Sequence, residues 1–141
     1  MPEAGYSGTP LAKKLGIKAG SSLVVLGAPA GFDELLAQTL PDAVTVRSRT
    51  GGKADVVISF HTGRADLERK LAKAAATMEV DGGLWIAWPK QASGMATDIT
   101  GDVVREVVLP TGLVDVKVCA IDETWSGLRV CWRKDLRSTK R

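Results

Sequence analysis

Apolar residues along this chain fall either in short continuous runs or at helical spacing, and the two patterns alternate. The longest continuous run, Leu84–Trp88, is entered through Gly82 and Gly83 and is ended by Pro89. Because no polar residue interrupts it, both faces of this strand are expected to be covered, as in the middle of a parallel sheet. The run therefore predicts the central strand, and the polar loop after it is expected at the carboxyl edge of the sheet.

The same patterns predict five further strands and four helices. The strands are expected over residues 22–26, 43–46, 54–60, 114–121 and 128–133. The helices are expected over 10–15, 32–40, 63–78 and from Thr97 or Thr100 to Leu109. The helix over 63–78 is the clearest, because its apolar residues share one face: Leu67, Leu71, Ala74, Ala75 and Met78.

Strands separated by helices predict an α/β fold with a doubly wound, mostly parallel sheet of the Rossmann or methyltransferase type, in strand order 3-2-1-4-5-6. Residues 122–127 are too few for a crossover, so the last two strands are expected to form a C-terminal antiparallel hairpin that closes the sheet. In the last strand Arg129 and Arg133 alternate with Val130 and Trp132, which is typical of an edge strand with one wet face.

Length and composition indicate one domain, because 141 residues with 45% hydrophobic content are enough for a single core. We predict a loose leader over 1–8, a single α/β domain over 9–133 and a basic C-terminal tail over 134–141. The sequence has no membrane-spanning stretch and no secretory signal, so the protein is expected to be cytoplasmic and to have no membrane partner.

The positive charge is concentrated at the C-terminus. The net charge is +3, and residues 133–141 hold five basic residues against Asp135, a net of +4, which leaves −1 for the rest of the chain. A folded domain that binds a nucleic-acid duplex normally carries a basic stripe on its surface. We therefore expect a solvated tail, with nucleic acid as a partner only weakly and through the tail.

Residues that commonly bind metals or act as nucleophiles are few. Cys119, Cys131 and His61 are the only cysteines and histidine, and they lack the paired spacing of a zinc site. No metal site is predicted, and both cysteines are expected to be free thiols. No Ser/His/acid or Cys/His catalytic arrangement is predicted either, and His61 is interpreted as a loop residue at the carboxyl edge.

The candidate ligand site begins in the loop after the first strand, which Gly27 and Gly31 bracket. Such a loop could bring backbone N–H groups to a phosphate or a ribose. However, LGAPAG does not satisfy G-x-G-x-x-G, and Pro29 removes one of the amides. A plain turn is the simpler interpretation.

The loop after the central strand is richer in polar side chains. Lys90 offers a cation, Ser93 and Thr97 offer hydroxyls, and Asp98 offers a carboxylate. Either these groups contact a ligand, or Lys90 pairs with Asp98 or with Asp122 of the hairpin.

Lys117 and Asp122 complete the candidate site. Lys117 stands in the middle of a predicted strand, where a buried ammonium is costly unless it is paired. It is therefore expected to meet a carboxylate or to emerge at a cleft.

Three strings, GYSGTPLAKKLGIKAG, WIAWPKQASGMATDIT and LPTGLVDVKVCAIDETWSGLR, resemble a short bacterial family, mainly actinobacterial, that is known only as a domain of unknown function. The resemblance covers nearly the whole chain, and it implies no established activity and no catalytic residues. At fold level the chain is similar to a shortened class I S-adenosylmethionine-dependent methyltransferase. It departs from these enzymes in its first loop and in having Arg47, instead of an acidic ribose ligand, after the second strand. No cofactor is therefore predicted.

The leading hypothesis is a non-catalytic binding or regulatory module on a degenerate methyltransferase-like fold, with an unidentified small molecule or protein as its partner. It rests on an intact fold pattern joined to a degraded cofactor loop, and fold alone does not imply activity. The alternative is a small-molecule or nucleotide-using enzyme with its site at the switch point of the sheet.

Overall fold

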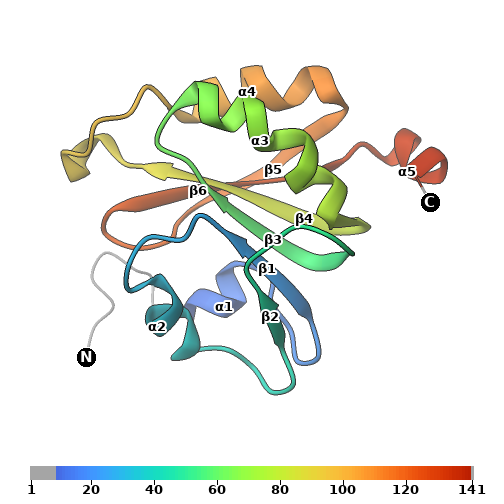
Figure 1. The fold of residues 1–141 in the computed structure, drawn as a ribbon, viewed down its shortest axis with the longest axis horizontal. Helices are drawn as coiled ribbons and strands as arrows, with labels where there is room; N and C mark the ends of the chain where they lie inside the picture. Colours follow the sequence, from blue (N-terminus) through green and yellow to red (C-terminus); the bar gives the residue numbers. More distant parts are fainter. Residues whose placement is uncertain (1–8, 141) are drawn as a thin grey trace.

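The computed structural model describes residues 9–140, which form an α/β fold (Figure 1). The strands are β1 (Ser22–Leu26), β2 (Thr45–Arg47), β3 (Ala54–Phe60), β4 (Met78–Pro89), β5 (Leu113–Ala120) and β6 (Trp125–Trp132). The helices are α1 (Leu11–Lys14), α2 (Phe32–Ala37), α3 (Arg64–Thr77), α4 (Gly101–Val108) and α5 (Lys134–Lys140), with short 3₁₀ turns η1 (Gln91–Ser93) and η2 (Leu109–Thr111). The predicted leader over 1–8 lies outside the described residues, and the basic tail contains α5.

The six strands form one sheet in the order β2-β1-β3-β4-β6-β5. Strands β2, β1, β3 and β4 are parallel, whereas β6 is antiparallel to both β4 and β5. The predicted doubly wound class and closing hairpin are therefore confirmed. The predicted order 3-2-1-4-5-6 is wrong, because β3 lies between β1 and β4 and β6 lies inside β5.

Burial explains the correction to the strand order. Strand β3 is buried at six of its seven positions, so it occupies the interior, whereas β2 has three residues and none of them is buried. Strand β5 is exposed over Asp115–Val118, while β6 is buried at five of its eight positions. The sheet therefore ends at β5, and the prediction that Arg129 lies on an edge strand is wrong.

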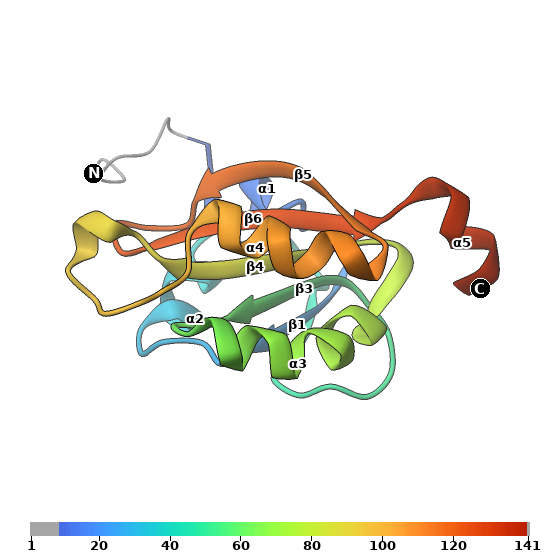
Figure 2. The same cartoon turned by 90° about the horizontal axis from the view of Figure 1, so that it is seen from above.

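Two apolar layers cover the two faces of the sheet (Figure 2). Helices α3 and α4 pack on one face, and α1 and α2 pack on the other. Trp88 belongs to the α3 and α4 layer, whereas Trp85 belongs to the α1 and α2 layer and donates its Nε1–H to the Leu15 carbonyl at 2.9 Å. Both tryptophans are buried, as predicted for the central strand.

Residues 9–140 contain five α-helices, the longest of which is α3 with 14 residues. None of the helices there has the length and apolar content that a membrane span requires.

Candidate functional site at the carboxyl edge

The loops after β1, β3 and β4 meet the β5–β6 hairpin loop at the carboxyl edge of the sheet, where the site was predicted. The chain enters β2 on one side of β1 while β3 lies on the other side, so the switch point lies between β1 and β3. Gly27, at the end of β1, lies so close to β3 that a Cβ there would be 3.2 Å from the Phe60 carbonyl oxygen. The switch point is therefore closely packed at the backbone.

Gly27 and Gly31 serve the turn between β1 and α2. Their φ angles are +69° and +89°, in the left-handed region that glycine adopts without steric cost. The helix that follows has only six residues. The left-handed backbone of the turn thus explains both glycines, and the close approach to β3 is a second reason for glycine at position 27.

Lys90 and Asp122 hold the hairpin loop against the end of β4. Lys90 Nζ donates to the main-chain carbonyl of Asp122 at 2.7 Å, and the Lys90 N–H donates to the Thr124 carbonyl at 2.8 Å. Asp122 Oδ1 accepts the N–H groups of Thr124 and Trp125, both at 2.8 Å. Lys90 therefore contacts the main chain of Asp122, and neither of the predicted pairings with a carboxylate forms among residues 9–140.

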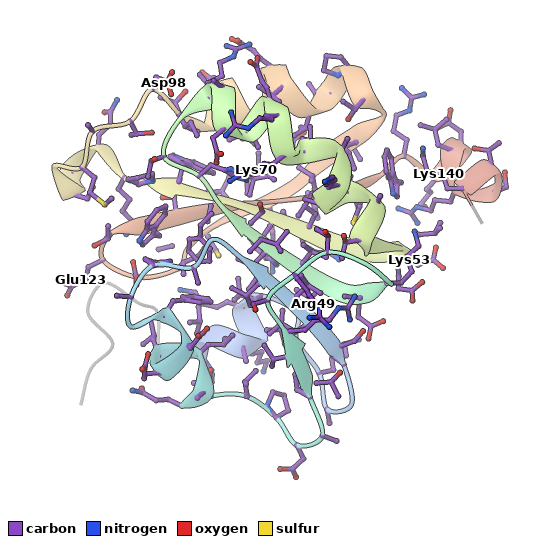
Figure 3. All side chains as sticks on the ribbon, viewed as in Figure 1. Arg49, Lys53, Lys70, Asp98, Glu123 and Lys140 are labelled. Carbon is purple, nitrogen blue, oxygen red and sulfur yellow. The ribbon has the colours of Figure 1, made fainter. Side chains whose placement is uncertain are left out.

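The remaining polar side chains of the loop after β4 also bind backbone groups. Ser93 Oγ donates to the Lys90 carbonyl at 2.6 Å, and Thr97 Oγ1 accepts the Ile99 N–H at 3.1 Å. Asp98 Oδ1 accepts the N–H of Arg64 at 2.7 Å, next to the start of α3 (Figure 3). Asp98 thereby caps a helix end whose own N-cap residue is a glycine.

Three aromatic side chains occupy the edge between these loops. Phe32 begins α2, Phe60 ends β3, and Trp125 begins β6; all three are buried. The ring centroids of Phe32 and Phe60 are 4.8 Å apart and those of Phe60 and Trp125 are 5.1 Å apart, in edge-to-face contacts. This aromatic cluster connects the loop after β1 to the hairpin and leaves the switch point filled with apolar side chains.

Lys117 does not belong to this site, so the prediction that it pairs with a carboxylate or faces a cleft is wrong. It lies on the edge strand β5 and is exposed, with no ion pair among residues 9–140. The prediction assumed that Lys117 is buried, but β5 is the outermost strand, so the Lys117 ammonium remains in water.

Sequence reasoning missed a hydrogen-bonded chain of Ser59, His61 and Asp66. Ser59 Oγ donates to His61 Nε2 at 2.7 Å, and His61 Nδ1 donates to Asp66 Oδ2 at 2.7 Å. Ser59 and His61 are 2% and 3% exposed, so no substrate reaches them in this conformation. His61 is therefore a buried bridge from β3 to α3, and the interpretation as a loop residue is corrected.

Burial and charge act in opposite directions on this chain of residues. Desolvation lowers the pKa of His61 below its ordinary value, although the hydrogen bond and charge of Asp66 act to raise it. Burial acts to raise the pKa of Asp66, but hydrogen bonds from Lys70 and His61 outweigh it and lower that pKa. The folded state thus favours a neutral imidazole beside an ionised carboxylate.

A cavity of about 550 Å³ borders the loop after β1 on the side away from Lys90. It lies between β1, α2 and the end of β2, and Gly27, Asp33 and Arg47 line it. Arg47, which was predicted to follow the second strand, is the last residue of β2, and its Nη2 donates to the Gly51 carbonyl at 2.8 Å. An acidic and a basic side chain therefore face this space together.

Cys119 and Cys131 are free and half-buried, and burial raises the pKa of the Cys119 thiol. Among residues 9–140 no three His, Cys, Asp or Glu side chains are placed to hold a metal ion. The candidate site is thus built from loop-closing hydrogen bonds, an aromatic cluster and the buried Ser59–His61–Asp66 chain.

The sequence model of a family described as "Protein of unknown function (DUF3052)" matches residues 12–134. The chain belongs to the DUF3052 family. This match confirms the resemblance to a domain of unknown function that the sequence strings indicated. No curated protein matches the DUF3052 chain.

Solved structures similar to this DUF3052 chain include methyltransferases. The magnesium protoporphyrin IX methyltransferase of Synechocystis PCC 6803, with bound SAH, gives a TM-score of 0.58 at 15% identity over 82% of this chain and 75% of that chain. An O-methyltransferase family 2 protein of Planctomyces limnophilus DSM 3776, in complex with apigenin, gives 0.62 at 12% identity over 82% of this chain and half (50%) of that chain. The fibrillarin pre-rRNA processing protein of Methanococcus jannaschii gives 0.53 at 15% identity, covering 88% and 69%. These likenesses show a methyltransferase-like Rossmann fold.

Proposed function

We propose that this DUF3052 chain is a non-catalytic binding or regulatory module on a methyltransferase-like fold. The observation that carries the proposal is the aromatic cluster of Phe32, Phe60 and Trp125 at the switch point, where doubly wound folds usually bind their ligands. Buried rings fill the crevice between the loop after β1 and the hairpin, and this supports a role without methyltransferase chemistry.

The engagement of the polar loop residues supports the same proposal. Lys90, Ser93 and Asp98 satisfy backbone groups of their own loops and of α3. Using them on a substrate would break these hydrogen bonds, at a net cost of about 0.5–1.5 kcal/mol each. The partner under this proposal is a small molecule or a protein, and the cytoplasmic location remains a prediction from the sequence.

Calorimetric titration with S-adenosylmethionine, S-adenosylhomocysteine and nucleotides tests the proposal. We expect no binding at micromolar concentration, because the aromatic cluster fills the crevice between β1, β3 and the hairpin and the loop after β1 does not match G-x-G-x-x-G. Phe60→Ala is the matched variant, because it removes one ring of the cluster without changing charge. Micromolar binding to the unchanged protein, followed by methyl transfer, would show that the proposal is wrong.

The second candidate is an enzyme with its site at the switch point, and the Ser59–His61–Asp66 chain favours it. The order of contacts, hydroxyl to Nε2 and Nδ1 to carboxylate, is the order that activates a serine nucleophile. A fluorophosphonate probe would then label Ser59, and Ser59→Ala would abolish the label while Ser93→Ala would retain it. The non-catalytic proposal predicts no label, because Ser59 is buried.

Nucleic acid as a partner finds little support in the geometry of the tail. Arg133 pairs with Asp135 at 3.2 Å, Arg137 Nε donates to the Trp132 carbonyl at 3.0 Å, and Lys140 Nζ lies 4.0 Å from the centre of the Trp132 ring. These cations are held by contacts within the chain. Tail-mediated binding would be recognised by strong salt dependence that truncation removes.

A further inference from the structure

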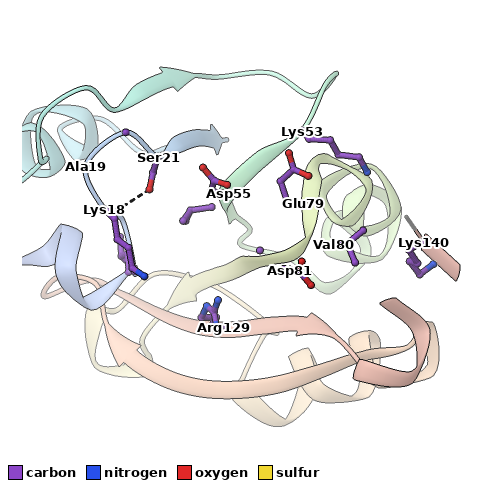
Figure 4. A pocket seen from close by; sticks show the side chains of 15 residues that line it. Lys18, Ala19, Ser21, Lys53, Asp55, Glu79, Val80, Asp81, Arg129 and Lys140 are labelled. Carbon is purple, nitrogen blue, oxygen red and sulfur yellow. Dashed lines mark hydrogen bonds between the residues drawn. The ribbon is translucent and has the colours of Figure 1, made fainter. Parts of the chain in front are cut away.

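A cavity of about 870 Å³ opens at the amino edge of the sheet, opposite the loops described above (Figure 4). The loop between α1 and β1, the first residues of β3 and β4, and Arg129 of β6 line it. Its volume lies within the range of about 300–1,000 Å³ that is typical of small-molecule sites. The cavity therefore has the size of a ligand site.

Arg129 is the half-buried cation of this cavity. Within residues 9–140 its guanidinium group makes no hydrogen bond and no ion pair. It lies across Gly83, where an added Cβ would overlap Nε and come within 2.7 Å of Nη2. Gly83 does not have a positive φ, so its backbone does not require glycine, and the Arg129 side chain occupies the space that a Cβ would take.

The other cations of the cavity differ in how they are held. Lys53 Nζ donates to the Ala76 carbonyl at 2.9 Å, and Lys140 Nζ lies over the Trp132 ring. Lys18 is exposed, and its ammonium has no partner within residues 9–140. Lys18 and Arg129 therefore remain to bind an anion.

Carboxylates from β3 and β4 occupy a different part of the same cavity. Figure 4 shows Glu79 and Asp81 along the start of β4, away from Lys18. Asp55 is partly engaged, because its Oδ2 accepts the N–H and the hydroxyl of Ser22 at 2.9 and 3.2 Å. Lys18 thus lies on one side of the cavity and Glu79 on the other, with Arg129 between Lys18 and Asp81, and Lys53 and Lys140 also line the cavity.

We propose that this cavity binds a small zwitterion of the amino-acid or short-peptide type. Its carboxylate would bind Arg129, whose planar fork matches two oxygens, with Lys18 beside it. Its ammonium group would lie at Glu79, next to Asp81. Glu79 and Asp81 would repel a second anionic group of the ligand at that position, because like charges would be brought together.

This inference rests on the proposed role as a binding module, but a separate measurement tests it. Binding of S-adenosylmethionine with turnover would overturn only the proposed function. Absence of zwitterion binding would overturn only the present inference.

The experiment is a titration of the ¹⁵N-labelled chain with free amino acids and dipeptides, each also as its N-acetyl and its carboxamide derivative. We expect some zwitterions to shift the amide signals of Gly82, Gly83 and Arg129. Blocking either charge should weaken binding about tenfold or more, the loss expected for a charge-assisted hydrogen bond. No binding at millimolar concentration, or equal binding of the blocked derivatives, would overturn the inference.

Variants connect the binding to the named residues. Arg129→Gln should weaken it about tenfold or more, and Gly83→Ala should weaken it by displacing the guanidinium group while keeping the charge. Lys134→Gln is the matched control, because it removes one exposed positive charge that does not line the cavity. Glu79→Gln should weaken the zwitterion but leave the N-acetyl derivative unaffected. Equal affinity in Arg129→Gln, Gly83→Ala and Lys134→Gln would contradict the assignment.

Discussion

The two edges of the same sheet differ in how their polar and apolar groups are used. At the carboxyl edge, Phe60 sits between two other rings, and polar residues such as Lys90 and Asp98 are bonded to main-chain groups. At the amino edge, an open cavity holds Arg129 with no ionic partner among residues 9–140. In this chain the crevice between β1, β3 and the hairpin is filled by packing, a cavity remains beside β2, and the cavity that holds Arg129 lies at the opposite edge.

The largest expected effect comes from opening the closed edge. Phe60→Ala should lower the free energy of unfolding by about 3–5 kcal/mol, because it leaves a cavity between two buried rings. Glu79→Ala, at the rim of the open edge, should change it by less than about 0.5 kcal/mol. Urea unfolding followed by circular dichroism measures both. Similar losses in the two variants would remove the contrast between the edges.

Gly82 and Gly83 sharpen the comparison within the open edge. A Cβ on Gly82 would come within 2.6 Å of the main-chain oxygen of Asp55, whereas the nearest atoms to a Cβ on Gly83 belong to the long side chain of Arg129, which can change rotamer. Gly82→Ala should therefore cost about 1–3 kcal/mol of stability, and Gly83→Ala less than about 0.5 kcal/mol. Thermal and urea unfolding of the pair provide the test. Equal losses would mean that Arg129 is fixed in place.

His61 gives the closed edge a pH dependence. Because burial lowers its pKa in the folded state, the unfolded chain binds the proton first as the pH falls. The neutral imidazole therefore stabilises the folded state fully above the pKa of histidine in the unfolded chain, about 6.5. Below that pH the free energy of unfolding falls by up to about 1.4 kcal/mol per pH unit, until the pH reaches the pKa of His61 in the folded state.

Urea unfolding between pH 7.5 and 5.5 at constant ionic strength measures this loss. His61 is the only histidine, so its contribution can be isolated in this range. His61→Gln should be less stable at pH 7.5 but should show a flatter pH dependence. An unchanged slope in His61→Gln would assign the effect to other groups.

The smallest effect is expected at the cap of α3. Asp98→Ala removes the acceptor for the Arg64 N–H and should cost about 0.5–2 kcal/mol, near the lower value because the site is exposed. Thr97→Ala, in the same loop, removes only a local turn contact and is the control. Urea unfolding compares the two. A larger loss in Thr97→Ala would mean that Asp98 is not the cap.

Some features of the site could be predicted and others could not. The position of the loop after β4 was predicted, because Leu84–Trp88 has the continuous apolar pattern of a central strand. The role of Asp98 was not, because its partner Arg64 is 34 residues away in sequence. A local signal did exist for the Ser59–His61–Asp66 chain. Ser59 lies two residues before His61, at the spacing that places two side chains on the same face of a strand, and Asp66 follows five residues after His61 in the first turn of α3.

The sequence by itself determined the six strands, the helices α1 to α4 but not α5, the buried central strand, the closing hairpin and the opposite faces of Trp85 and Trp88. These follow from periodicity, which each segment carries within its own residues. Only the tertiary structure decided that β3 lies beside β1, that β5 is the edge, and that Phe32, Phe60 and Trp125 fill the switch point. Those outcomes depend on which distant segments bury one another's surfaces, and the free energy of that burial belongs to the pairing and not to either segment alone.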